Sequence, residues 1–101
     1  MNNIEMIAFE MISEIGNAKS LFMESLDLAE KKDFDQAEKL INEGKKCLLN
    51  AHKPHMSLIQ QEANGESIEF SLLLMHAEDQ LMTTEMLKEL AIKMIRMYRQ
   101  I

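Results

Sequence analysis

The sequence is poor in the residues that turn a chain or cross-link it. Among its 101 residues there are three glycines, one proline and one cysteine, and tryptophan is absent. So few glycines and prolines exclude the many hairpin turns of a β-sandwich or a β-barrel. The single cysteine, Cys47, excludes an intramolecular disulfide, which suits a reducing cytosol.

Basic residues and long apolar runs are scarce as well. The 11 lysines and arginines stand against 17 aspartates and glutamates, a net charge of −6, so nucleic acid and anionic membranes are not expected as main partners. No apolar run approaches the roughly 18–20 residues that cross a bilayer. The N-terminal stretch also lacks the basic cluster that leads a secretory signal. We therefore expect a cytoplasmic protein of one domain, residues 1–101, without membrane insertion.

The abundant apolar residues are Leu, Ile, Met and Ala, which favour helices. In the first third of the chain they recur at helical spacing from Ile4 to Ala29, which predicts a first helix. Asn2 or Asn3 can serve as its N-cap. The pattern breaks at Lys32-Asp33.

A second helix is predicted from Phe34, with Asp33 as its N-cap. It ends at Asn64-Gly65, because glycine can adopt the left-handed conformation that closes a helix. Gly44 lies on its apolar face, where it permits close helix packing. Pro54 is expected to kink this helix without ending it, because the apolar pattern resumes in phase beyond it.

A third helix is predicted from about Ile68 to Tyr98, with Ser67 as its N-cap. The two joints are short, so the chain is expected to form an all-α, antiparallel, up-down-up three-helix bundle. The third helix has more apolar surface than two neighbours can cover, which predicts self-association. One apolar sector contains Leu72, Met75, Met86, Leu87, Leu90, Met94 and Met97, and a second contains Leu74, Ala77, Leu81, Ile92 and Ile95.

Three polar residues, His76, Asp79 and Thr83, interrupt the first of these sectors and share its face. In one interpretation His76 is a core histidine bonded to a carbonyl, and Asp79 is a surface acid. In the other they form a site, because a neutral imidazole has a free lone pair and is a good phosphoryl acceptor. A carboxylate buried there would need a cation or another partner.

The remaining candidates carry weaker signals. His52, His55 and Glu62, with His76, would be ligands for zinc, but the sequence lacks HExxH and a cysteine pair. Cys47 is interpreted as a buried, inert thiol. The ten methionines are either core filler or, around His76, a soft surface that accepts two different protein partners.

Four segments in order resemble one family. Ser71–Thr83 reads SLLLMHAEDQLMT and resembles the sLLlvHAQDHLMT signature of the lactose/cellobiose-type enzyme IIA of the bacterial phosphotransferase system. Gly16–Ser20 resembles its G-x-A-[RK]-S motif in the first helix, and Asp33–Ala37 resembles its gdf-x-x-A start of the second. Ala51–Gly65 resembles its AH-x-x-QT-x-Liq-x-EA-x-G motif.

This resemblance implies a homotrimeric phosphotransferase component. His76 would accept a phosphoryl group from the phosphocarrier HPr and pass it to a cysteine of enzyme IIB. During uptake through the membrane enzyme IIC, enzyme IIB would then phosphorylate a β-linked disaccharide such as lactose, cellobiose or chitobiose. Asp79 would meet its two symmetry mates and share one Mg²⁺ per trimer, because a hard divalent cation relieves the repulsion of three carboxylates. We expect phosphorylation at Nε2 of His76, because a helix-borne histidine keeps Nδ1 near an acceptor.

The chain departs from this pattern close to the expected site. Glu78 replaces a glutamine, Gln80 replaces the second histidine, and His55 and Met56 replace Gln-Thr directly after Pro54. Glu78 is expected to add negative charge near His76 and to disfavour phosphohistidine. Two alternatives to the carrier are a non-catalytic helical scaffold, in which His76 is structural, and a degenerate paralogue.

Overall fold

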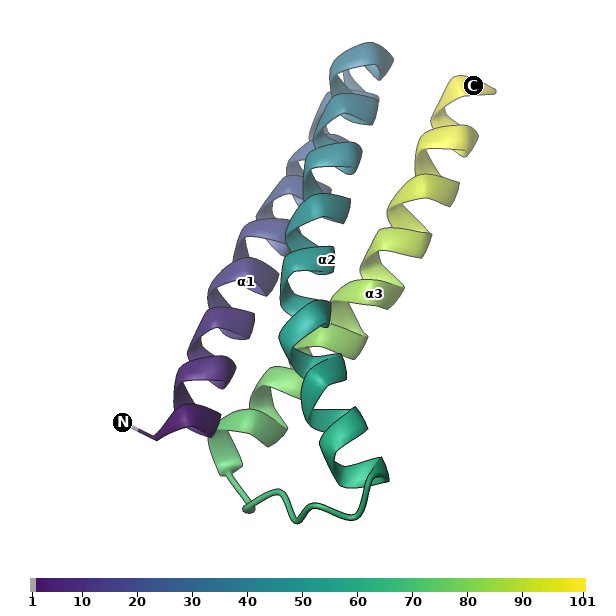
Figure 1. Ribbon diagram of the computed structural model, residues 1–101. Coiled ribbons are helices and arrows are strands. Elements are labelled where there is room, and N and C mark those ends of the chain that lie inside the picture. The colour runs from purple at the N-terminus through teal and green to yellow at the C-terminus, as the bar shows by residue number, and fades with distance from the viewer. Residues whose placement is uncertain (1) are drawn as a thin grey trace.

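A computed structural model describes residues 2–101 and contains three long helices. They are α1 (Asn3–Glu30), α2 (Phe34–Ala63) and α3 (Leu72–Arg99). The helices run up, down and up in an elongated bundle (Figure 1), with extents of 51 × 24 × 18 Å. No strand occurs in residues 2–101, so the predicted all-α bundle is confirmed. None of the three helices is apolar enough over a sufficient length to cross a membrane.

Each helix begins at a side-chain cap, which satisfies a backbone N–H that the helix itself leaves free. The caps are Asn2, Asp33 and Ser71, which accept hydrogen bonds from the backbone N–H of Glu5, Gln36 and Leu74 over 2.8, 3.4 and 3.2 Å. The caps predicted at Asn2 and Asp33 are therefore confirmed.

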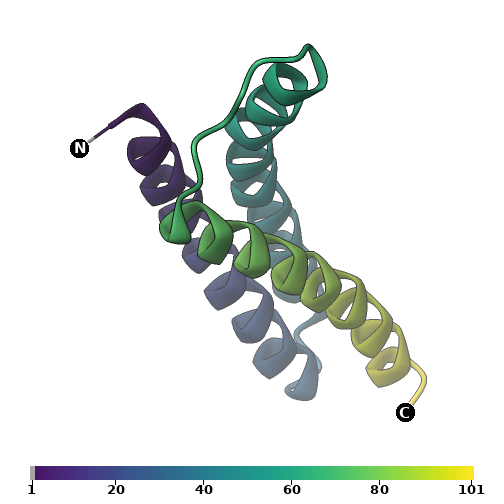
Figure 2. The same ribbon diagram turned by 90° about the horizontal axis from the view of Figure 1, so that it is seen from below.

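The predicted start of the third helix is wrong. The helix begins at Leu72 with Ser71 as its cap, and not at Ile68 with Ser67. The end of α2 and the start of α3 lie apart (Figures 1 and 2), and a loop without regular secondary structure connects them. Residues 66–70 have no regular secondary structure, and a chain that is not helical can span more than the roughly 1.5 Å per residue of a helix. Ile68 anchors the connection by packing against the core.

The core lies along one face of α1, which packs against both other helices, while α2 and α3 touch each other least. The predicted apolar face of α1 is confirmed, since its buried residues are Ala8, Met11, Ile15, Ala18, Phe22, Ser25 and Ala29. Gly44 of α2 lies against the ring of Phe22, and a Cβ there would come within 2.5 Å of the ring. The close approach of α1 and α2 therefore requires glycine at this position.

The middle and the end of α2 also follow the sequence pattern. The helix continues through Pro54 to Ala63, as predicted from the apolar residues beyond the proline. Gly65 has a φ of 90°, so it adopts the left-handed conformation expected at the helix end. The last turns of α2 lie away from the first turns of α1 (Figure 1), and this separation opens the end of the bundle where α3 begins.

Candidate functional site

The outward face of α3 is apolar along almost its whole length. We call this surface the α3 stripe. Its apolar residues are between 40% and 73% exposed, and they are Leu72, Met75, Met82, Met86, Leu90, Met94 and Met97. Leu87, which the periodicity places in the same sector, is instead partly buried against the core. The second predicted sector faces inward, with Leu74, Ala77, Leu81 and Ile95 buried.

The polar residues of the first sector lie on the α3 stripe. His76, Asp79 and Thr83 are all exposed. Within residues 2–101 His76 has no hydrogen-bond partner, so its interpretation as a core histidine is wrong, and the acceptor expected at Nδ1 is not found. The Thr83 hydroxyl donates to the backbone carbonyl of Asp79 over 2.8 Å. The arrangement leaves the imidazole accessible, with a carboxylate one helical turn away.

The methionines are mostly a surface feature. Of the ten, Met11 is fully buried, while eight are between 36% and 68% exposed: Met6, Met23, Met56, Met75, Met82, Met86, Met94 and Met97. Their interpretation as core filler is therefore wrong. A stripe of flexible, polarizable side chains around His76 is the kind of surface that adapts to different partners.

The other two histidines lie on α2, in different surroundings. His55 is 14% exposed, and its Nε2 lies 2.6 Å from Oε2 of Glu78. His52 is exposed and lines a small hollow with Lys45, Glu85 and Lys88 among others. No three His, Cys, Asp or Glu side chains within residues 2–101 gather as metal ligands, so the chain does not assemble the zinc site considered from its histidines and Glu62.

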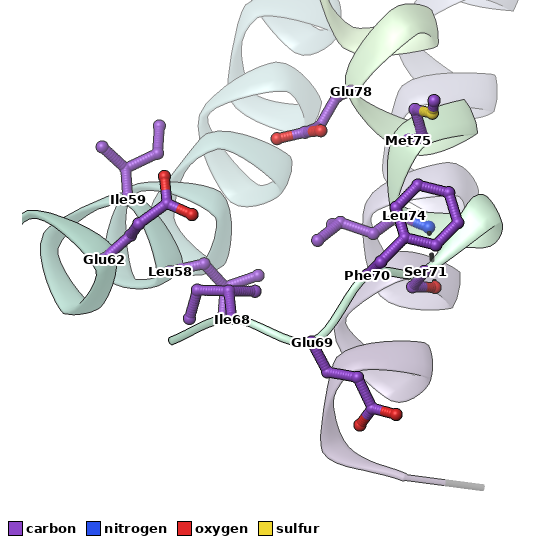
Figure 3. A pocket seen from close by; sticks show the side chains of 10 residues that line it. All are labelled: Leu58, Ile59, Glu62, Ile68, Glu69, Phe70, Ser71, Leu74, Met75 and Glu78. Carbon is purple, nitrogen blue, oxygen red and sulfur yellow. Dashed lines mark hydrogen bonds between the residues drawn. The ribbon is translucent and has the colours of Figure 1, made fainter. Parts of the chain in front are cut away.

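Glu78 does not lie beside His76, although the two are close in sequence. Residues two apart on a helix project about 200° apart around its axis. The Glu78 carboxylate extends from α3 toward α2 (Figure 3) and contacts His55 there. The charge that the sequence placed next to the histidine therefore lies on the opposite flank of α3.

A cleft of about 370 Å³ separates the start of α3 from the end of α2. Its apolar wall is formed by Leu58, Ile59, Ile68, Phe70, Leu74 and Met75, and its polar rim by Glu62, Glu69, Ser71 and Glu78. Figure 3 shows Leu74 pointing from α3 toward this space and Ser71 capping the helix. The periodicity of the sequence did not indicate this cleft, because it depends on the separation of α2 from α3.

Cys47 lies half-buried on α2. Burial raises the pKa of its thiol, and the negative charge of Glu14, a hydrogen bond with Glu14 and the charge of Glu43 raise it further. A raised pKa keeps the sulfur protonated near neutral pH, and a protonated thiol is a poor nucleophile. The interpretation of Cys47 as an unreactive thiol agrees with this environment, although the residue is less buried than expected.

These features define a class of protein: a small helical bundle that presents an accessible histidine on an apolar surface suited to protein partners. A sequence model described as "PTS system, Lactose/Cellobiose specific IIA subunit" matches residues 6–99. The chain belongs to this family of the phosphotransferase system.

Individual relatives agree with this assignment. The chain is 38% identical over 99 residues to the PTS system lactose-specific EIIA component of Staphylococcus epidermidis, covering 98% of this chain and 95% of that protein. The crystal structure of the PTS cellobiose-specific enzyme IIA from Bacillus anthracis superposes with a TM-score of 0.94 at 39% identity, covering 99% and 92% of the two chains. The solution structure of the IIA(Chitobiose)–HPr complex of the N,N'-diacetylchitobiose branch of the Escherichia coli phosphotransferase system follows at a TM-score of 0.84 and 28% identity, covering 99% and 97%.

The family assignment supplies the general function. The protein is a phosphoryl-carrier component of a phosphotransferase system for sugar transport.

Proposed function

We propose that His76 is the phosphoryl carrier, that it is phosphorylated by HPr, and that it passes the phosphoryl group to a cysteine of enzyme IIB during uptake of a β-linked disaccharide. The observation that carries this proposal is the position of His76. It is the histidine that lies exposed on the α3 stripe, whereas His55 is held by Glu78 and His52 lies among charged residues of α2 and α3.

The chemistry requires a neutral imidazole with an accessible lone pair. Nε2 of His76 attacks the phosphorus of the donor, so that a phosphorus–nitrogen bond forms at His76 as the bond to the donor atom breaks. Nδ1 keeps its proton throughout, and the electron pair leaves with the donor. In the second transfer a cysteine thiolate of enzyme IIB forms a phosphorus–sulfur bond and His76 leaves. Nε2 is favoured because it lies farther from the backbone than Nδ1 on the same ring.

The apolar surroundings support a relay between proteins. Met75 and Leu72 lie exposed near His76, so a docked partner would cover them and exclude water from the phosphohistidine. Water exclusion and correct positioning supply most of the catalysis in transfers of this kind. HPr is proposed as the donor because a relative of the same fold is described in complex with HPr. Lactose, cellobiose and chitobiose relatives all match the chain, so the proposed sugar is this class of disaccharide.

We further propose a homotrimer that is held together along the α3 stripe and contains one Mg²⁺ bound by three copies of Asp79. A continuous exposed apolar surface supports self-association. Asp79 is an exposed carboxylate on that surface, without an ion-pair partner in the part of the chain that the structure describes. A single carboxylate is too few ligands for Mg²⁺, but three copies at a symmetry axis, with water, fit its preference for oxygen ligands. The ion would neutralise the converging charges; the phosphoryl transfer itself uses His76.

Phosphorylation by the purified relay tests the main proposal. Incubation with phosphoenolpyruvate, enzyme I and HPr should produce an acid-labile, alkali-stable adduct on one residue, and His76→Gln should abolish it without loss of helicity. His52→Gln is the matched control, since it removes another exposed histidine and should leave acceptance unchanged. An adduct on His52 or His55, or none on the wild type, would favour the scaffold or the degenerate paralogue.

The position of the phosphoryl group on the ring and the metal are tested separately. Phosphorus–nitrogen coupling in NMR spectra should show attachment at Nε2, and attachment at Nδ1 would contradict that assignment. Asp79→Leu should remove the mutual repulsion and leave a trimer that no longer responds to chelators. Loss of the trimer in Asp79→Leu would contradict the proposed role of the metal.

A further inference from the structure

In the described part of the chain, residues 2–101, one contact between polar side chains joins the first half of α3 to a neighbouring helix. It joins Nε2 of His55 on α2 to Oε2 of Glu78 on α3 over 2.6 Å, and the two side chains are 14% and 40% exposed. Within residues 2–101 the other link of this kind between α2 and α3 joins Arg99 to Glu38 over 2.7 Å, at the far end of the pair.

Apolar packing leaves this part of α3 weakly held toward α2. The cleft of about 370 Å³ lies between Leu58 and Ile59 of α2 and Leu74 and Met75 of α3, with Glu78 on its rim. The buried residues in these first turns are Leu74, Ala77 and Leu81. A helix that faces open space on one flank can rotate about its axis more easily than one packed on both flanks. The His55–Glu78 contact bridges the two helices at the rim of this space.

The proton arrangement of the pair follows from the burial of the ring. Nδ1 of His55 is buried without a hydrogen-bond partner. The tautomer with its proton on Nε2 donates to the Glu78 carboxylate and leaves only a lone pair at Nδ1, so no buried N–H lacks an acceptor. This assignment gives a directional, charge-assisted hydrogen bond across the two helices.

Fixing Glu78 also fixes the direction in which His76 points. The two residues lie in the same turn, about 3 Å apart along the axis and about 200° apart around it. With the Glu78 carboxylate held toward α2, His76 is directed to the opposite flank, onto the α3 stripe. A rotation of the first turns of α3 would move both side chains together.

We propose that His55 is a positioning residue for His76: through Glu78 it sets the rotation of the first turns of α3 and so the approach of the imidazole to its partners. This inference rests on the proposed role of His76 as the carrier. It assigns a role to the contact between His55 and Glu78, which joins α2 to α3 over 2.6 Å.

Four variants separate the hydrogen bond from general packing. His55→Phe keeps an aromatic ring but removes the donor, and Glu78→Leu removes the acceptor. Each should slow phosphoryl acceptance from HPr about 10-fold, because small displacements of a reacting group cost rates of this order. His55→Gln and Glu78→Gln keep a donor or an acceptor and should stay within about 2-fold of the wild type. If His55→Phe fails to fold, the half-exposed Glu78→Leu provides the same test.

A control and a second readout distinguish this inference from the proposed function. Glu38→Gln weakens the other link between α2 and α3, the ion pair of Glu38 with Arg99. Arg99 lies about 31 Å from Glu78 along α3, so this variant should leave the rate of phosphoryl acceptance unchanged. In NMR spectra of the unphosphorylated protein, the imidazole signals of His76 should move in His55→Phe and stay in place in Glu38→Gln. The inference would be overturned if His55→Phe and Glu78→Leu left both the His76 signals and the rate of phosphoryl acceptance unchanged. It would also be overturned if Glu38→Gln slowed acceptance as much as these two variants do. If the wild-type protein accepts no phosphoryl group from HPr, but the His76 signals still move in His55→Phe, only the proposed carrier function is refuted.

Discussion

Gly44 and Gly16 are both helical glycines, but their surroundings differ. At Gly44 a Cβ would lie 2.5 Å from Phe22, whose ring is fully buried, whereas at Gly16 no heavy atom lies within 4 Å of the corresponding position. The apolar pattern of α2 indicated close packing at Gly44. It did not name Phe22 as the neighbour, because the register of α1 against α2 is a tertiary property.

We expect Gly44→Ala to destabilise the protein and Gly16→Ala to stabilise it. Forcing a methyl group against a buried ring costs about 1–3 kcal/mol, more than the roughly 1 kcal/mol that alanine gains over glycine in a helix. At Gly16 only that gain applies. Urea denaturation of the two variants against the wild type measures both changes. A Gly44→Ala variant as stable as Gly16→Ala would contradict the close contact with Phe22.

The thiol of Cys47 offers a test of the local electrostatics. Burial and the negative Glu14 and Glu43 raise its pKa, so the thiolate forms at a higher pH than in an exposed cysteine. Glu14→Gln should lower the pKa of Cys47 and shift the pH profile of alkylation by iodoacetamide to lower pH. Glu24→Gln, also on α1, is the control and should leave the profile unchanged. An unaltered profile in Glu14→Gln would exclude Glu14 as a cause.

At the level of elements, the helix boundaries followed from caps, and the one error arose where two caps compete. Ser67 and Ser71 both precede the third helix, and each is followed by apolar residues. Local sequence cannot choose between them, since either hydroxyl can accept from a helical N–H. The structure uses Ser71, and residues 66–70 form the loop that connects the separated ends of α2 and α3.

The choice of cap leads to a direct stability prediction. Ser71→Ala should destabilise the protein by about 0.5–2 kcal/mol, since it removes the acceptor for the N–H of Leu74. Ser67→Ala should change the free energy of unfolding by only a few tenths of a kcal/mol. Thermal and urea denaturation of the two variants measure the difference. If both variants lost the same free energy of unfolding, Ser71 would not be the N-cap of α3.

On the scale of the whole molecule, the α3 stripe is the main apolar surface that no other part of the described chain covers. Seven apolar side chains, each at least 40% exposed, run along one helix of a chain with a net charge of −6. Continuous exposed apolar surfaces of this kind are typical of the places where a protein binds another protein. The excess of apolar residues on the third helix predicted this from the sequence, and the proposed trimer would bury it.

We expect Met86→Lys to dissociate the proposed trimer. Met86 is 60% exposed at the middle of the α3 stripe, and three lysines would converge there at the axis and repel one another. Leu49→Lys is a matched control, since Leu49 is 52% exposed on α2. Sedimentation at micromolar concentration should give a monomer for the first variant and a trimer for the second, both with unchanged helicity. A monomeric wild type would contradict the trimer.

The sequence by itself determined the helical class, two of the three helix starts and the inward faces of α1 and α2, because helix propensity, caps and apolar periodicity are local properties that act within a few turns. It also placed His76, Asp79 and Thr83 on one face. Only the tertiary structure decided that this face points outward, that Glu78 turns away from His76 toward His55, and that a cleft opens beside α3. These features depend on how far apart two helices lie and how each is rotated, and both are set by packing between residues distant in the chain.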